Sequence, residues 1–267
     1  MSNAPTIDFT PPPMLAHTVA DGATPAGIFG SPRRYVQGEG LIDETGHYLG
    51  ALGFQRAAVL LSTRSQAAEG KRLLASLQRA GIPAELATFG GECSLEEIEQ
   101  HTSTLGDLDQ APDVLIAIGG GKAVDTGKAI AHRLGIPSVM VPSLASNDAP
   151  CAAVSVIYTA QGVTLDAEIY AENPALVLMD TAVVANAGER YLVAGMGDAM
   201  ATWYEARACQ QNPAGITAFG GRPTLAGAAI AKLCADTIYE QGIEASASLR
   251  ARRVSAPLEK IVEANTL

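Results

Sequence analysis

DVLIAIGGGKAVDTGK, residues 113–128, is the stretch that decides the predicted fold of this chain. It opens with Val114–Ile118, an apolar β-branched run that is typical of a buried strand in a parallel sheet. Gly119–Gly121 follow, and a helix is expected from Lys122 to Leu134. Glycines let backbone N–H groups approach an anion, and the start of a helix adds partial positive charge. The stretch therefore predicts a nucleotide-binding α/β protein, with an ordinary glycine-rich turn as the alternative.

The sequence around this stretch alternates between strand and helix patterns. Further strands are expected at Arg33–Gln37, Ala57–Leu61, Ala84–Phe89 and Ser138–Val141. A helix is expected over Gln66–Ala80, where Gly81 ends it, and another begins at Ser94 with Glu97 as its capping-box partner. Strands that alternate with helices in this way predict an α/β fold with a doubly wound, Rossmann-like parallel sheet.

The pattern changes after residue 142. A polar stretch is followed by extended segments at Val154–Tyr158 and Val177–Met179, and from about Val183 the chain becomes helical. The helices are expected at Arg190–Cys209, Thr224–Glu240 and Leu258–Ala264. We therefore predict a mobile, proline-rich extension over 1–30, a dinucleotide-binding α/β domain over 31–182, and an all-helical domain over 183–267.

Composition excludes several classes of function. The 267 residues carry a net charge of −10, so no surplus of Lys and Arg exists to bind nucleic acid. The chain has no run of about 18 apolar residues and no signal-peptide pattern, so we expect neither a membrane span nor export. The four cysteines form no CxxC pair, which fits free thiols in a reducing cytoplasm.

Two aspartates stand in unusual surroundings. Asp148 lies in a polar loop after a buried strand, where ligands of doubly wound proteins bind, although a turn or helix-cap carboxylate is the alternative. Asp198 lies among small and apolar residues of an expected helix. A charge there must be paired, ligated or at a cleft, and a salt-bridged core aspartate is the alternative. Lys122 is a phosphate or ribose ligand or a solvated residue at a helix start.

Four stretches together resemble the iron-containing, or metal-dependent, alcohol dehydrogenase family, and within it the glycerol dehydrogenases. They are GGGKAVDTGKA (119–129), SLASNDAPCAAVSVIYT (143–159), NPALVLMDT (173–181) and RYLVAGMGDAMATWYEARAC (190–209). The similarity extends from about residue 28 to residue 267. It implies a dinucleotide-binding α/β domain, a helical domain, and an active site in the cleft between them.

The resemblance also implies roles for individual residues. Gly120, Gly121 and Lys122 match the residues that hold the NAD pyrophosphate, and the residues that line the cofactor match Ser143, Val154 and Tyr158. Asp148 matches a residue that contacts the polyol substrate, and Asp198 matches one of three ligands of a Zn²⁺ or Fe²⁺ ion. The implied reaction is NAD-dependent oxidation of glycerol to dihydroxyacetone, in which the metal polarises the substrate hydroxyl. We also expect a homo-oligomer.

The sequence departs from the family in its metal ligands and in its cofactor residues. The other two metal ligands are histidines on later helices, but the last histidine here is His132. We therefore expect a C-terminally truncated family member, inactive or nearly so alone, because catalytic Zn²⁺ needs three protein ligands. In addition, Ser62, Thr63 and Arg64 stand where relatives often place an acidic ribose ligand, so NADP use is possible.

Three functions compete. The first is a metal- and NAD-dependent polyol dehydrogenase, and the second is a relative that acts on a 2-hydroxy acid or a glycerol phosphate. The negative charge of Asp148 opposes an anionic substrate and favours a neutral polyol. The third is a non-catalytic nucleotide-binding remnant without a metal site.

Overall fold

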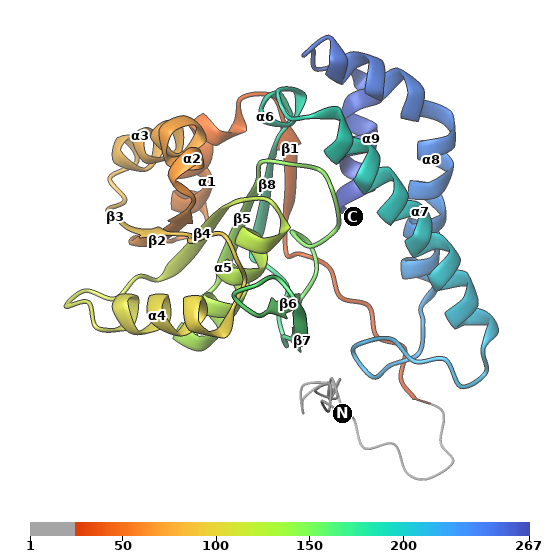
Figure 1. Ribbon diagram of the computed structural model, residues 1–267, viewed down its shortest axis with the longest axis horizontal. Helices are drawn as coiled ribbons and strands as arrows, with labels where there is room; N and C mark the ends of the chain where they lie inside the picture. Colours follow the sequence, from red (N-terminus) through yellow and green to blue (C-terminus); the bar gives the residue numbers. More distant parts are fainter. Residues whose placement is uncertain (1–24) are drawn as a thin grey trace.

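A six-stranded parallel sheet is the centre of the computed structural model, which describes residues 25–267 (Figure 1). Its strand order is β1-β8-β5-β4-β2-β3, and every neighbouring pair is parallel. The strands are β1 (Tyr35–Gly38), β2 (Ala57–Leu61), β3 (Ala84–Thr88), β4 (Val114–Gly119), β5 (Ser138–Pro142) and β8 (Leu176–Asp180). The predicted doubly wound α/β sheet is confirmed.

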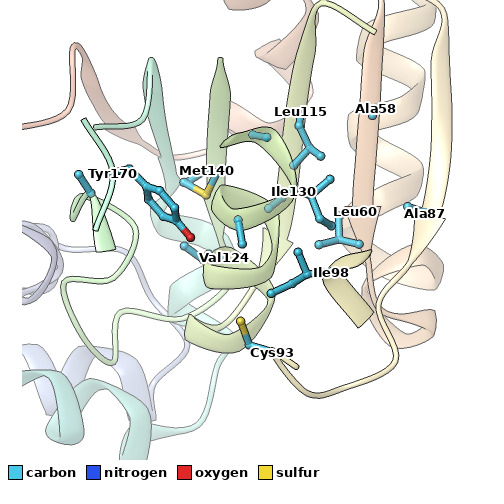
Figure 2. Packing of buried hydrophobic residues seen from close by; sticks show 14 of the residues in the cluster. Ala58, Leu60, Ala87, Cys93, Ile98, Leu115, Val124, Ile130, Met140 and Tyr170 are labelled. Atoms are coloured by element: carbon cyan, nitrogen blue, oxygen red, sulfur yellow. The ribbon is translucent and has the colours of Figure 1, made fainter. Parts of the chain in front are cut away.

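Both faces of the sheet are buried, because alternate residues of each strand point to opposite sides. On one side Leu60, Leu115 and Met140 pack against α4 (Leu95–Gly106) and α5 (Gly121–Leu134), as Figure 2 shows. The other face packs against η1 (Leu41–Glu44), α1 (Thr45–Ala51) and α3 (Lys71–Arg79). Continuous apolar runs such as residues 114–118 follow directly from this double burial.

The helix after β2 begins earlier than the sequence pattern predicted. It starts at α2 (Thr63–Ser65), where the Ser62 hydroxyl accepts a hydrogen bond from Ser65 N, and continues through a π-helical segment, η2 (Gln66–Gly70). The prediction of a start at Gln66 was wrong because it followed the apolar periodicity and overlooked Ser62 as an N-cap.

The capping box expected at α4 is half formed. Glu97 N donates to the Ser94 hydroxyl (3.3 Å), as predicted, but the Glu97 carboxylate accepts from Gly90 N (2.6 Å) instead. The carboxylate therefore ties the loop before the helix rather than closing the box on Ser94.

A two-stranded antiparallel hairpin follows β5 and stands outside the main sheet. Its strands are β6 (Val154–Tyr158), which was predicted, and β7 (Thr164–Ile169), which was not. The hairpin lies beside α5, where Ser155 Oγ donates to the Asp125 carbonyl (2.8 Å).

The helices of the C-terminal part pack on one another beside the sheet (Figure 1). They are α6 (Thr181–Ala185), α7 (Glu189–Gln211), α8 (Leu225–Arg250) and α9 (Ala256–Thr266). Their own core includes Leu192, Ile238, Leu258 and Ile261. None of the helices within 25–267 is both long and apolar enough to span a bilayer.

The predicted division into domains stays a prediction. Helix α6 lies across the expected boundary between residues 182 and 183. Most of the expected N-terminal extension, 1–24, lies outside the described residues. Its last part runs along the loop between α7 and α8, where Gly27 pairs with Arg222.

Candidate functional site

The strand order has a switch point between β2 and β4. From β2 the chain moves outward to β3, and from β4 it moves in the other direction to β5. The connecting helices consequently lie on opposite faces and leave a crevice at the carboxyl ends of these strands. Ligands of doubly wound proteins bind in such a crevice. The Gly119–Gly121 corner lies at its centre.

The glycine corner leaves the start of α5 open to a ligand. Gly119 has a φ of +156°, and a Cβ on it would lie 2.7 Å from Ala123 Cβ. A Cβ on Gly121 would lie 2.9 Å from the Asn147 side chain. Gly120 is the N-cap residue, and no side chain caps the helix. The first N–H groups of α5 are therefore available to an anion such as a pyrophosphate.

A cleft of about 1260 Å³ opens above this corner, more than the roughly 300–1,000 Å³ typical of ligand pockets. Seven of the eight predicted site residues line it: Gly120, Gly121, Lys122, Ser143, Asp148, Tyr158 and Asp198. The eighth, Val154, lines a smaller adjoining chamber of about 230 Å³. Asp148 and Asp198 line both cavities, so the large cleft and the small chamber meet at these two carboxylates.

Lys122 lies at the cleft but already has protein partners. Its Nζ is 2.7 Å from a carboxylate oxygen of Glu92 and 5.0 Å from the centre of the Tyr158 ring. The other Glu92 oxygen is buried without a hydrogen-bond partner among the described residues. An incoming phosphate would therefore compete with Glu92 for Lys122, and sequence reasoning missed this ion pair.

The two aspartates come from different elements and lie near each other at the cleft. Burial raises the pKa of Asp148, and the nearby Asp198 carboxylate raises that pKa further. Asp148 precedes a tight turn in which its carbonyl accepts from Cys151 N (2.8 Å). Asp198 lies on α7 with its side chain exposed, and no cation among residues 25–267 pairs with it. The prediction that Asp198 lies at a cleft is confirmed. The alternative, that it is a salt-bridged residue of the core, is wrong because its side chain is exposed.

A buried ion pair beneath the cleft was missed by sequence reasoning. Asp125 and Lys128, one turn apart on α5, are 6% and 3% exposed, and their charged atoms are 2.9 Å apart. Burial raises the pKa of Asp125, and the Lys128 ammonium opposes that rise. Lys128 also donates to the carbonyls of Ala149 (2.7 Å), Ala152 (3.2 Å) and Val154. The pair thus fixes the segment after Asp148 to the helix that begins at the glycine corner.

Asn265 of α9 was missed as well. Its Nδ2 donates to the Ala145 carbonyl and the Leu192 carbonyl, both at 2.9 Å. Gly195 of α7 approaches the same place so closely that a Cβ on it would lie 2.3 Å from the Ala145 carbonyl oxygen. These contacts hold the helix of Asp198 against the loop of Asp148.

The described residues do not make a complete metal site. No group of three His, Cys, Asp or Glu side chains within 25–267 could hold a metal ion. Catalytic zinc takes three protein ligands and one open position, whereas among the described residues only the carboxylates of Asp148 and Asp198 lie where the cleft and the small chamber meet. His47, His101 and His132 belong to α1, α4 and α5 of the sheet part and do not line the cleft.

The family model and the relatives that match this chain point to one family. The model of iron-containing alcohol dehydrogenases matches residues 32–181. The chain is 43% identical to a glycerol dehydrogenase of Thermotoga maritima over 236 residues, which cover 88% of this chain and 63% of the relative. It is 41% identical to one of Escherichia coli O6:H1 over 239 residues, or 90% of this chain and 64% of the relative.

A solved structure agrees with these relatives. The crystal structure of glycerol dehydrogenase from Schizosaccharomyces pombe superposes with a TM-score of 0.84 at 33% identity, over 91% of this chain and 61% of that one. The chain therefore spans somewhat less than two thirds of the length of the proteins it matches. By its matched sequence, its sheet order and its cleft, the chain belongs to the iron-containing alcohol dehydrogenase family.

Proposed function

We propose that this chain forms the cofactor-binding and substrate-facing part of a dehydrogenase that oxidises glycerol, or a similar small polyol, to dihydroxyacetone. Its hydride acceptor is a nicotinamide adenine dinucleotide, NAD or NADP. The observation that carries the proposal is that one cleft contains both the open glycine corner and the two carboxylates. The relatives named above are glycerol dehydrogenases, which supports the choice of substrate.

The glycine corner supplies the pyrophosphate site in this proposal. The N–H groups at the start of α5 bind the pyrophosphate oxygens, and Lys122 adds a positive charge. Ser143, whose N–H donates to the Gly119 carbonyl (2.9 Å), keeps the next loop beside the corner. Ser143 and Tyr158 then line the cofactor, while Val154 faces the smaller chamber.

Asp148 orients the substrate. Its carboxylate accepts a hydrogen bond from a polyol hydroxyl, and the smaller chamber beside it takes the carbon skeleton. Gly120, Gly121 and Lys122 would hold the nicotinamide cofactor, which would supply the acceptor for the hydride of the carbinol carbon. Because Asp148 and Asp198 both carry negative charge, a 2-hydroxy acid or a glycerol phosphate is disfavoured relative to a neutral polyol.

The described residues supply no three-ligand set for a metal ion. Asp198 is proposed as one ligand of Zn²⁺ or Fe²⁺ in a complete site. A small-molecule substrate, a cytoplasmic location and assembly into a homo-oligomer stay predictions.

Titration calorimetry of the chelator-treated chain with NADH tests the cofactor site. We expect one NADH per chain, and Gly121→Val should weaken binding at least tenfold because its side chain covers the helix start. Gly50→Ala is the matched control, since a Cβ at this glycine of α1 meets nothing within 4 Å. Absence of NADH binding by the unaltered chain would contradict the proposal.

A non-catalytic nucleotide-binding protein is the second candidate, and the incomplete metal site favours it. The two candidates differ in turnover. If the chain is a complete enzyme, it produces NAD(P)H steadily from glycerol and NAD(P) when Zn²⁺ or Fe²⁺ is added. NADH binding without turnover identifies a nucleotide-binding part that lacks chemistry of its own.

A further inference from the structure

The end of the cleft beside β2 belongs to the adenosine half of the cofactor, if the proposed function holds. Strand β4, which carries the glycine corner, has β5 on one side and β2 on the other. Asp148 and Ser143 follow β5, so the reacting nicotinamide lies on that side. An extended dinucleotide across the corner then places its adenosine ribose beside the residues that follow β2.

These residues carry the chemistry of a phosphate site. In doubly wound proteins an acidic residue near this position binds the ribose hydroxyls of NAD, whereas an arginine accommodates the 2′-phosphate of NADP. Here Ser62 directly follows β2 and Arg64 comes two residues later, and both line the cleft. The Arg64 side chain is exposed and forms no hydrogen bond or ion pair with any residue within 25–267.

A second arginine faces the same end of the cleft from the helical part. Arg190, at the start of α7, lies over the Tyr191 ring at 4.5 Å from its centre. The Arg190 guanidinium lowers the pKa of Tyr191, and the positive charge of Arg64 contributes to that decrease. Arg64 and Arg190 are therefore close enough in space to act electrostatically on one phenol group, although they come from opposite walls.

The carboxylates nearby do not cancel this positive charge. Of the acidic residues that line the cleft, Glu69 alone comes from the segment after β2. Its charge acts on Arg72, which also pairs with Asp43 (2.6 Å) and Asp180 (3.5 Å). Arg72 is therefore paired with Asp43 and Asp180, whereas neither Arg64 nor Arg190 forms an ion pair within residues 25–267.

We propose that this end of the cleft recognises the 2′-phosphate of NADP(H), with Arg64 and the Ser62 hydroxyl on one wall and Arg190 on the other. Guanidinium groups bind phosphate through charge-assisted hydrogen bonds, and no carboxylate stands at Ser62 to repel the phosphate or to bind the two ribose hydroxyls. The inference rests on the proposed dinucleotide site and names the form of the cofactor that the site prefers.

Calorimetric titration of the whole chain with NADPH and NADH, and with adenosine 2′,5′-bisphosphate and 5′-AMP, tests this inference by binding alone. We expect the 2′-phosphorylated member of each pair to bind more tightly than the other. Arg64→Gln should weaken NADPH binding about tenfold and change NADH binding less than twofold. Ser62→Asp should shift the preference toward NADH. Arg56→Gln is the control, because Arg56 lies at the amino end of β2, and this change should alter neither affinity.

The outcomes separate this inference from the proposed function. Binding of NADH that is as tight as or tighter than that of NADPH, or equal weakening of both by Arg64→Gln, overturns the 2′-phosphate site and leaves the dinucleotide site intact. Failure of both dinucleotides to bind overturns the proposed function and this inference together. Thermal unfolding of each variant verifies that an altered affinity does not come from loss of the fold.

Discussion

The two walls of the cleft are built on different principles. The sheet-side wall consists of the glycine corner, α5 and the loop after β5, and it is supported by the buried Asp125–Lys128 pair. Its proposed ligand contacts are mostly backbone N–H groups, which the sheet places by its own geometry. Within the described residues this wall offers the uncapped start of α5 that we propose as the pyrophosphate site.

The helix-side wall, which consists of the cleft-lining residues of α6 and α7, relies on individual side chains. Asp198 projects from α7 without a protein partner among the described residues, and α8 exposes large apolar side chains such as Leu233 (65%) and Ile243 (86%). A metal site needs several side chains from different helices at once, whereas an anion site at a helix start needs one correctly formed turn. We therefore expect the described part of this chain to bind a cofactor more readily than a metal ion.

The largest expected effect comes from removing the positive charge beneath the sheet-side wall. Lys128→Met leaves the buried Asp125 carboxylate uncompensated and frees three carbonyls, so we expect a loss of about 3–5 kcal/mol in unfolding free energy. Urea denaturation measures the change. In Asp125→Asn/Lys128→Met the loss should be smaller, because no buried charge remains. A single-variant loss below about 1 kcal/mol would show that the pair does not support the wall.

A smaller effect is expected where the two walls touch. Gly195→Ala places a methyl group 2.3 Å from the Ala145 carbonyl oxygen, so we expect a loss of about 1–3 kcal/mol and a displaced α7. Gly197→Ala on the same helix meets nothing within 4 Å and should stabilise the protein by up to about 1 kcal/mol through helix propensity. Equal destabilisation by both substitutions would show that close packing at Gly195 is not what joins the walls.

Acidification should destabilise the sheet-side wall because it protonates Glu168, which pairs with Arg133 of α5. Burial alone would raise the pKa of Glu168, but hydrogen bonds from Arg133 of α5 lower it overall. The pair therefore stabilises the fold fully above the ordinary glutamate pKa of about 4.3, and this stabilisation is lost as the pH falls through the lowered pKa.

Glu168→Gln tests that pH dependence. We expect the variant to be less stable than the unaltered protein by about 1 kcal/mol at pH 7, with the difference shrinking below pH 4. Urea unfolding at several pH values gives both numbers. A difference that stays constant from pH 7 to pH 3 would mean that the charge of Glu168 contributes nothing.

The smallest expected effect concerns the helix-side wall. Because the described residues offer no three-ligand group, treatment with a chelator or with equimolar Zn²⁺ should leave the melting temperature unchanged within error. A rise of several degrees with stoichiometric Zn²⁺, abolished by Asp198→Asn, would contradict the interpretation of this wall as an incomplete site.

The predictions from sequence succeeded where the signal was local. The bounds of β2 were predicted exactly as the structure has them, and β4 and α5 differ by one residue at an end, because apolar runs and glycines act within a few positions. Strand β7 was missed because its sequence, TLDAEI, is half polar and pairs with β6 alone. Such a strand lacks the burial on both faces that makes a strand visible in a sequence.

For the same reason, only some residues of the candidate site were predicted. The aspartates and glycines stand out in the sequence, and seven of eight predicted residues line the large cleft. Lys128 and Asn265 stayed hidden because their partners are backbone carbonyls far along the chain, at Ala152 and Leu192 among others. Spacing within a helix suggests an ion pair such as Asp125–Lys128, but it does not reveal which loop the pair holds.

We propose that the cleft binds a dinucleotide without any metal. A crystal structure of the chelator-treated chain with NADPH tests it most directly. The claim predicts the pyrophosphate over Gly120–Lys122 at the start of α5, with the adenosine ribose beside Ser62 and Arg64. A nucleotide bound elsewhere, or a cleft that stays empty at saturating NADPH, would contradict it.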